Sequence, residues 1–254
     1  MACLILCNKS STNMWKYDFT FNITMKTIGL IGGMSWESSL EYYRIINEVT
    51  KEKQGGLHSA QSLMYSVDFA EIETLQHQNK REELAQIMID SALRLEKGGA
   101  DIVVICTNTM HKLFPNAEKS VNIPVLHIAD ATAKKIVKNH YKKVWLLGTK
   151  FTMEEDFYKG RLVDDYDLEV VIPNENDRNI VHRIIYDELC LGIIHPDSKK
   201  EYQRIIKNLS NQWAEAIILG CTEIPLLIHQ EDVEIPLFDT TKIHAEAAVE
   251  RALQ

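Results

Sequence analysis

The sequence predicts an α/β protein made of two related halves, each a mostly parallel sheet flanked by helices. Three observations lead to this prediction. Apolar runs of strand length alternate with amphipathic helical segments, which is typical of a parallel sheet. One phrase occurs twice, at residues 101–108 and 215–223, where an acidic residue and an apolar run lead into Cys-Thr and a polar residue. The landmarks around both copies follow in the same order at nearly the same spacing.

The spacing of these landmarks indicates a duplication. Gly33 closes an apolar run and lies 73 residues before Cys106, whereas Thr149 closes another and lies 72 residues before Cys221. After each cysteine comes an Ile-Pro step that opens a further strand-like segment. Two unrelated α/β units could share such turns, but the repeated Cys-Thr step adds common chemistry to the common spacing. The combination favours duplication.

Hydrophobic periodicity places the individual elements in order. Apolar positions three and four residues apart mark helices, and Gly or Pro marks their ends. Thr152 and Glu155 fit a capping box, in which two side chains bind amides at the start of a helix. The expected strands lie at residues 28–31, 59–67, 102–105, 123–126, 144–147, 216–219 and 235–238, and the expected helices at 37–51 and 81–97, around 181–189, and from Pro196 onwards.

Composition and charge exclude several classes of function. The chain has 254 residues, of which 45% are hydrophobic and 25% charged, as in an ordinary globular protein with room for two domains. Its formal net charge of -8 argues against a nucleic-acid partner, because binding phosphates needs a basic surface. No apolar run approaches the roughly 20 residues that cross a bilayer, so no membrane partner is expected. The cysteine spacing favours a reducing, cytoplasmic location and no metal site.

The start of the chain stands apart from this pattern. Residues 1–24 are expected to form a loosely ordered extension, whereas Met25 opens the first clean strand. The apolar stretch at the beginning is too short for a secretory signal and has no basic residues before it. We therefore expect the functional fold to begin at Met25.

The repeated cysteines are the candidate catalytic groups. Ligands of open α/β sheets bind at the carboxyl ends of the strands, and Cys106 and Cys221 each follow an apolar strand. A helical turn after each strand would place the thiol near unpaired amides, which lower a thiol pKa from about 8.5 toward neutrality. Such a group suits proton transfer at neutral pH. Two thiols that face one pocket can remove a proton from one face of a carbon and return it to the other.

Other chemically active residues fit simpler roles. Cys190 lies outside the repeat and is expected to pack inside a helix, as buried cysteines commonly do. His111, His244 and Glu246 are expected on helix surfaces. His127 is expected to be partly buried with a backbone partner.

The motifs resemble those of the aspartate/glutamate racemase superfamily, in its aspartate-racemase branch and closest to the broad-specificity amino-acid racemases. The resemblance runs from residue 25 to about residue 253. It is carried by Ile-Gly-Gly-Met at residues 31–34, Cys-Thr-Asn-Thr at 106–109 and Gly-Cys-Thr-Glu at 220–223. Glutamate racemases fit less well, because they typically have a histidine where this chain has Glu223.

The resemblance implies how the fold and the site are organised. It implies two domains with pseudo-twofold symmetry, one formed by residues 25–126 with 240–254 and the other by 127–239, and an active site in the cleft between them. It implies racemisation of an amino acid by Cys106 and Cys221 as opposed acid and base, without pyridoxal phosphate or metal as cofactor, in a homodimer. The substrate-binding residues that it implies are Met34, Gln61, Thr107, Asn108, Thr132, Lys159, Thr222 and Glu223.

One departure from the family pattern concerns the substrate. Aspartate-specific members carry an arginine soon after the second strand, and its bidentate fork binds the side-chain carboxylate. Residues 66–71 of this chain contain no arginine and include Asp68 and Glu71. We therefore expect a neutral or broader range of amino acids rather than strict specificity for aspartate.

Two alternative functions remain open. On the same fold, the chain could be a related isomerase, such as a hydantoin racemase, that acts on another carboxylate. In a different class, it could be a non-catalytic amino-acid-binding protein or a thiol redox sensor. A redox pair needs Cα atoms within about 7 Å of each other, whereas two thiols that flank a substrate carbon stand farther apart.

Overall fold

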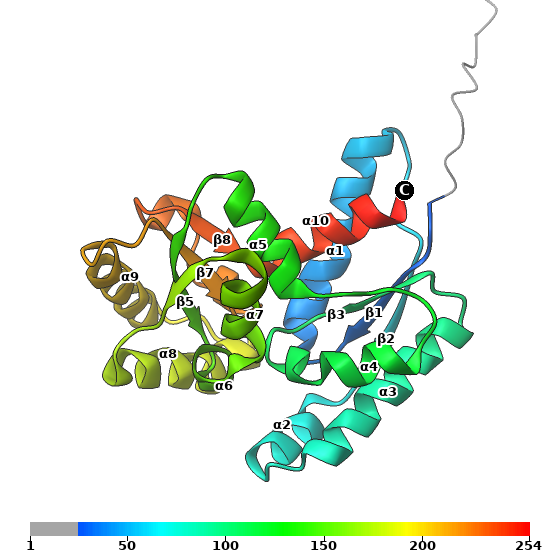
Figure 1. The fold of residues 1–254 in the computed structure, drawn as a ribbon, viewed down its shortest axis with the longest axis horizontal. Coiled ribbons are helices and arrows are strands. Elements are labelled where there is room, and N and C mark those ends of the chain that lie inside the picture. The colour runs from blue at the N-terminus through cyan, green and yellow to red at the C-terminus, as the bar shows by residue number, and fades with distance from the viewer. Residues whose placement is uncertain (1–24) are drawn as a thin grey trace, which may run out of the picture.

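The computed structural model describes residues 25–254, so the expected extension at residues 1–24 lies outside the described residues. Within the described part, the strands form two four-stranded sheets that lie side by side (Figure 1). Every strand pair in them is parallel. The predicted α/β class is confirmed.

The first sheet has the strand order β2-β1-β3-β4. One of its faces packs against the first helix, where Tyr42 and Ile46 share a core with Ile28, and the other face packs against a later helix through Met88 and Val103. The strands are β1 (Ile28–Gly32), β2 (Ser62–Ser66), β3 (Ile102–Ile105) and β4 (Val125–Leu126), and the helices are α1 (Trp36–Gln54), α2 (Phe69–His77), α3 (Arg81–Lys97) and α4 (Phe114–Ser120), with the 3-10 turn η1 (Thr109–Leu113) before α4.

The second sheet repeats this arrangement in the order β6-β5-β7-β8. Its core contains the apolar stripes expected around residues 181–189 and after Pro196. The strands are β5 (Lys143–Gly148), β6 (Glu169–Val171), β7 (Ala216–Gly220) and β8 (Leu237–Asp239), and the helices are α6 (Lys150–Glu154), α7 (Asp156–Tyr166), α8 (Glu175–Asp187) and α9 (Pro196–Ser210), with the 3-10 turns η2 (Leu189–Leu191), η3 (Ile224–Leu226) and η4 (Gln230–Asp232).

The two sheets therefore share one topology. In each, the chain starts at an inner strand, adds an edge strand on one side, and then crosses to the other side for the last two strands. β1 is equivalent to β5 and β3 to β7, so Cys106 and Cys221 follow equivalent inner strands. The duplication predicted from the landmark spacing is confirmed in the fold.

The last helix of each half packs on the other half. Helix α5 (Ile128–Lys138) follows β4 of the first sheet, yet its Ile128 and Ile136 lie in the core of the second sheet. Helix α10 (Thr240–Ala252) follows β8 of the second sheet, yet its Ala245 and Val249 lie in the core of the first. The two helices contact each other between the sheets (Figure 1). This exchange joins the halves through two apolar cores.

Some element boundaries differ from the sequence expectation. The capping box predicted at Thr152 and Glu155 is wrong, because the N-cap of α6 is Thr149, whose hydroxyl accepts a hydrogen bond from the Thr152 amide at 3.3 Å. The helix begins where β5 ends, which leaves the Thr152 hydroxyl free to lie 3.2 Å from that of Thr149. Strand β2 begins at Ser62 rather than at Ser59.

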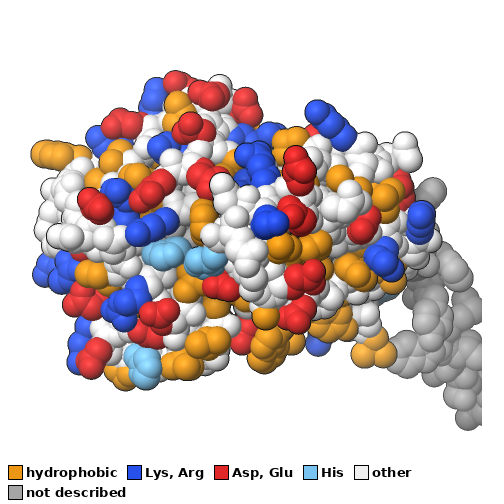
Figure 2. Space-filling model, turned by 90° about the horizontal axis from the view of Figure 1, so that it is seen from below, with side chains coloured by type: hydrophobic (Ala, Val, Ile, Leu, Met, Phe, Trp, Pro, Cys, Tyr) orange, Lys and Arg blue, Asp and Glu red, His pale blue; other side chains and the backbone are white. Residues whose placement is uncertain are grey.

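The surface carries charges of both signs. On the face shown in Figure 2, acidic and basic side chains are interspersed, without a broad field of one sign. Across residues 25–254, no helix combines the length and the apolar character needed to span a membrane.

Candidate active site

Both repeated cysteines lie at the carboxyl ends of inner strands. Cys106 follows β3 and is fully buried, and Cys221 follows β7 with 7% of its surface exposed. In each sheet, the chain passes from the first strand to an edge strand on one side and then to a strand on the other side. Open parallel sheets bind ligands in the crevice at this change of direction, which lies between the carboxyl ends of the two inner strands. The cysteines therefore occupy the ligand-binding edge of both sheets.

A cavity lies between the loops that follow these strands. Met34 after β1 and Thr107 after β3 line it from the first half, whereas Thr149 after β5 and Cys221 with Glu223 after β7 line it from the second. Its volume of about 20 Å³ has room for one water molecule. The other lining residues are Phe69, Gln76, Thr109, Met110, Ile185, Tyr186 and Cys190.

Glu223 connects the second thiol to the first half. The Cys221 thiol donates to Glu223 Oε2 at 2.9 Å, and the Thr222 hydroxyl donates to the same oxygen at 3.0 Å. Glu223 Oε1 accepts from the Ser35 hydroxyl at 2.9 Å and from the Ser35 amide at 3.2 Å. Four hydrogen bonds thus hold a buried carboxylate beside a thiol, and two of them cross from one half to the other.

The first thiol has a different environment. Cys106 packs with Tyr42 and Val104 in the apolar core shared with α1 and α10, and its thiol has a long contact of 3.9 Å to the Val104 carbonyl. Asn108, which stands where the second half has Glu223, donates through Nδ2 to the Thr240 hydroxyl at 3.0 Å. Its buried Oδ1 has no partner among the described residues and can accept a hydrogen bond from a ligand.

The thiol pKa values shift in the direction opposite to the expectation. Burial raises the pKa of the Cys106 thiol. Burial, followed by the charge of Glu223, raises the pKa of the Cys221 thiol well above its usual range. The expected lowering by helix amides is wrong here, because η1 begins only at Thr109 and the Cys106 thiol lies in the apolar core instead of at a helix end. Both shifts favour the protonated form of the thiol.

Buried side chains donate hydrogen bonds to a backbone carbonyl in each Cys-Thr loop. His111 Nε2 accepts from the Ile128 amide at 3.1 Å, which leaves Nδ1 as the donor to the Thr107 carbonyl at 2.7 Å. Burial lowers the pKa of His111 to about 4, so the ring is neutral. In the second half, the Thr241 hydroxyl donates to the Thr222 carbonyl at 3.5 Å.

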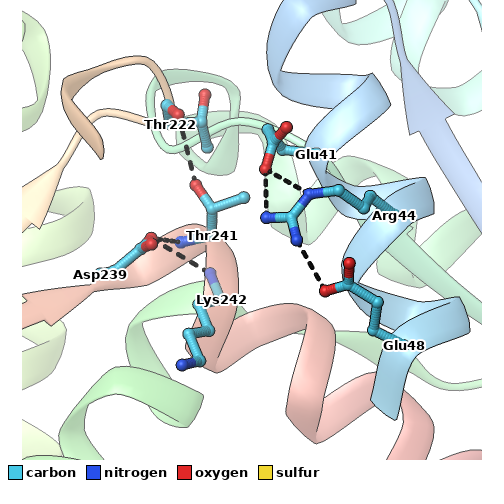
Figure 3. A network of polar contacts seen from close by, with 7 residues as sticks. All are labelled: Glu41, Arg44, Glu48, Thr222, Asp239, Thr241 and Lys242. Atoms are coloured by element: carbon cyan, nitrogen blue, oxygen red, sulfur yellow. Dashed lines mark hydrogen bonds and ion pairs between the residues drawn. The ribbon is translucent and has the colours of Figure 1, made fainter. Parts of the chain in front are cut away.

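A groove of about 530 Å³ is lined by residues of α1, of the Thr222 loop and of the start of α10. Figure 3 shows polar contacts among these residues. Asp239 caps α10 there by accepting from the amides of Thr241 at 2.9 Å and Lys242 at 3.1 Å. Arg44 lies between two glutamates of α1 and contacts each of them at 2.6 Å. The Asp239 cap fixes the start of α10, which carries the hydroxyl that binds the Thr222 carbonyl.

A protein-family model described as Asp/Glu/Hydantoin racemase matches residues 31–248, which include both Cys-Thr loops. This chain belongs to that family. The motifs predicted a member of the racemase family, and the match confirms this prediction.

Solved structures and a curated relative agree with this assignment. A candidate Asp/Glu racemase from Yersinia pestis is 52% identical, with a TM-score of 0.84, and the match covers 91% of this chain and 100% of that one. An aspartate racemase homologue from Pyrococcus horikoshii OT3 is 38% identical, with a TM-score of 0.78 over the same shares of the two chains. The broad specificity amino-acid racemase RacX of Bacillus subtilis (strain 168) is 26% identical over 175 residues, which cover 66% of this chain and 72% of that protein.

The structure gathers only some of the predicted substrate-binding residues of this racemase. Met34, Thr107 and Glu223 line the cavity, and Asn108 and Thr222 belong to the same loops. Asn108 and Thr222 are not themselves lining residues, and the three remaining ones lie farther along the chain from these loops. Gln61 is exposed before β2, Thr132 is buried within α5 and donates to the Ile128 carbonyl at 2.8 Å, and Lys159 is half-buried on α7.

Other residues occupy places that differ from the sequence expectation. Cys190 packs against the core of the second half, as expected, but it lies in the 3-10 turn η2 and also lines the cavity with Cys221. His111 and His244 are buried, so their expected surface positions are wrong. His111 is covered by the start of α5 and by the His244 ring, whereas His244 lies between Tyr42 of α1 and the Leu126 carbonyl. His127 is buried and accepts from the Ala129 amide at 3.1 Å, as expected of a histidine with a backbone partner.

The structure also reveals site residues that the sequence analysis missed. Ser35 binds Glu223 across 188 positions of sequence, and no local pattern reports a contact of that range. Thr109 lies 3.0 Å from Thr149 between their hydroxyl oxygens, which joins the loops after β3 and β5. Thr109 follows the Cys-Thr-Asn motif directly, so its place beside the site could have been inferred from the motif.

Proposed function

We propose that this protein racemises amino acids without a cofactor, with Cys106 and Cys221 as the opposed acid and base on the substrate α-carbon. The observation that carries the proposal is that the two thiols follow equivalent inner strands of a duplicated fold, and that loops of both halves, with Cys221 on one side and Thr107 next to Cys106 on the other, line one cavity. Membership of the racemase family and the similarity to a broad specificity amino-acid racemase support it.

The reaction needs one proton removed and one returned. A thiolate takes the α-proton from one face of the substrate carbon, and the thiol opposite then gives its proton to the other face. The product has inverted configuration, the two cysteines have exchanged protonation states, and the reverse reaction swaps their roles. Because the pKa shifts favour the protonated form of both thiols, one of them must first lose its proton.

Glu223 is the residue placed to take that proton. It already accepts the hydrogen bond of the Cys221 thiol, and its remaining hydrogen bonds keep it in position. The hydroxyl of Thr107 and the free Oδ1 of Asn108 are suited to the carboxylate and the ammonium group of the substrate, respectively. A cavity of about 20 Å³ is too small for an amino acid, so the halves separate to admit it.

The substrate range is proposed to be broad, and strict specificity for aspartate is not expected. No arginine follows the second strand in residues 66–71, and among residues 25–254 no lysine or arginine lines the cavity. A dicarboxylate would therefore bring a second negative charge into a buried site that has no cation to pair with it.

Incubating the protein with a panel of L-amino acids in D2O, without added cofactor, tests this proposal. We expect deuterium at the α-carbon of the D product while the recovered L substrate still carries protium at early times, because two different groups handle the two faces. Cys106→Ala and Cys221→Ala should each lower racemisation by about 10³-fold or more. A hydantoin belongs in the panel, because exchange with it alone would favour the related isomerase, and no exchange with any compound would overturn the racemase.

A further inference from the structure

Two side chains from different halves meet in the wall of the cavity. Gln76 of α2 is 5% exposed, and Tyr186 belongs to α8 of the second half. The Tyr186 hydroxyl donates to Gln76 Oε1 at 3.3 Å. Both residues line the cavity with Cys221, so a side chain that enters it meets this pair.

The amide of Gln76 retains donor capacity. Its Nε2 donates to the Met110 thioether at 3.2 Å, and sulfur of this kind is a weak acceptor. An amide nitrogen carries two hydrogens, and leaving a buried donor poorly satisfied costs free energy. A ligand oxygen in the cavity would give Gln76 a better acceptor than the thioether does.

Aromatic packing fixes Tyr186 beside this amide. Its ring meets His77 edge-on, with centroids 5.9 Å apart, and lies tilted against His182 at 4.8 Å. Burial, with the nearby Cys221 thiol, raises the pKa of Tyr186, so its hydroxyl keeps its proton. The pair is therefore a neutral surface whose available donor is the Gln76 amide.

The charge in the cavity decides which acceptor fits. Among the described residues, Glu223 is the one acidic or basic residue of the lining, and it lies beside Cys221. A carboxylate on the substrate side chain would add an unpaired negative charge to a site from which water is largely excluded, and this is costly. A neutral carbonyl or hydroxyl oxygen would take the same hydrogen bonds without that cost.

We propose that Gln76 and Tyr186 select the side chain of the substrate, and that the preferred amino acids end in an uncharged oxygen, as an amide or a hydroxyl group does. In the complex, the substrate oxygen accepts from the Gln76 amide in place of the Met110 sulfur. This inference rests on the racemase function proposed above and narrows its substrate class.

Pairs of amino acids with the same shape and different charge test the substrate class. We expect kcat/KM for asparagine to exceed that for aspartate, and that for glutamine to exceed that for glutamate, by about tenfold or more, as in sites built to hydrogen-bond one partner. Equal or higher values for the acids, with racemisation intact, would overturn this inference alone. Absence of exchange with every amino acid would overturn the racemase proposal and this inference with it.

A substitution separates recognition from structural support. Gln76→Leu should lower kcat/KM for the amide substrates by about tenfold, the value of one buried hydrogen bond, and leave methionine, which has no oxygen at its tip, within about threefold. Gln78→Leu, an exposed glutamine at the end of the same helix, is the matched control and should change neither. An equal loss for glutamine and methionine would show that Gln76 only supports the fold and would overturn its role in selection.

Discussion

The first and second Cys-Thr loops sit at equivalent points of one topology and differ in what surrounds the thiol. After β7, Cys221 donates to a carboxylate that accepts three further hydrogen bonds. After β3, Cys106 packs among apolar side chains, and Asn108 takes the place of the carboxylate. The repeated fold thus keeps the position of each thiol and has a carboxylate beside only one of them among the described residues. The two halves share a scaffold and give their thiols unequal surroundings.

The loops also differ in how their carbonyls are held. A titratable ring, His111, donates to the Thr107 carbonyl, whereas a hydroxyl, that of Thr241, donates to the Thr222 carbonyl. The residue that binds the first carbonyl therefore titrates, whereas the residue that binds the second does not. This contrast can be tested one residue at a time.

The largest effect is expected at Glu223. Glu223→Gln keeps the size of the side chain and removes the proton acceptor beside Cys221, so kcat should fall by about 10²- to 10⁴-fold. The charge of Glu223 raises the pKa of the Cys221 thiol, so the variant should also show a lower pKa for this thiol when alkylation is followed against pH. Glu231→Gln, at an exposed carboxylate, is the control. A thiol pKa that does not move would break the proposed asymmetry between the halves.

Lowering the pH should destabilise the protein through His111, which binds the carbonyl of the first Cys-Thr loop. The pKa of His111 is about 4 in the folded protein against an ordinary 6.5, so the unfolded chain takes up this proton first. The contribution of neutral His111 to the free energy of unfolding is complete above pH 6.5. It is lost as the pH falls toward 4, at about 1.4 kcal/mol per pH unit. Urea unfolding at several pH values should show a shallower pH dependence for His111→Gln than for the natural chain. Identical slopes would remove His111 from this role.

A smaller effect is expected at the contact between the halves. Ser35→Ala removes the hydroxyl that donates to Glu223 Oε1, and a hydrogen bond to a charged group contributes about 1.5–3 kcal/mol. The free energy of unfolding should fall by that amount, and kcat should fall less than in Glu223→Gln. Ser210→Ala, remote from the site on the surface end of α9, gives the baseline. A loss of activity without any loss of stability would assign Ser35 to the chemistry instead.

The smallest effect on stability is expected at Thr241, which binds the second Cys-Thr loop. Thr241→Val removes the donor of a hydrogen bond that is already long at 3.5 Å, so the free energy of unfolding should fall by about 0.5–1.5 kcal/mol. The pH dependence of unfolding should stay that of the natural chain, because no titratable group is lost. A changed pH dependence would mean that the supports of the two loops are not separate.

Local patterns predicted the scaffold well. The sequence predicts helix 81–97 at its observed bounds, because the segment carries an apolar stripe and Gly98-Gly99 follow it directly as a stop signal. The Cys-Thr loops were placed at the strand ends for the same reason, since a buried strand followed by polar residues is a local signal. The capping box predicted at Thr152 is wrong because β5 ends directly before Thr149, which caps the helix instead. The sequence contains two threonines that could serve as the N-cap, and the end of the strand decides between them.

The chemistry of the site depended on contacts that sequence does not report. The direction of the thiol pKa shifts depends on how completely each thiol is buried, and this follows from where α1 and α10 pack. The Ser35–Glu223 contact and the Gln76–Tyr186 contact join positions 188 and 110 residues apart. His244 was expected at the surface because the face of a helix that becomes covered is decided by a partner far along the chain.

The exchanged helices α5 and α10 determine which parts of the chain can exist alone. A chain cut between residues 126 and 127 would leave the first sheet without Ala245 and Val249, and the second fragment would carry a helix with its apolar face exposed. Apolar faces of this kind promote aggregation. Neither half is therefore an independent module that could be grafted, expressed or inherited separately, and engineering that replaces one half must carry the helix of the other with it.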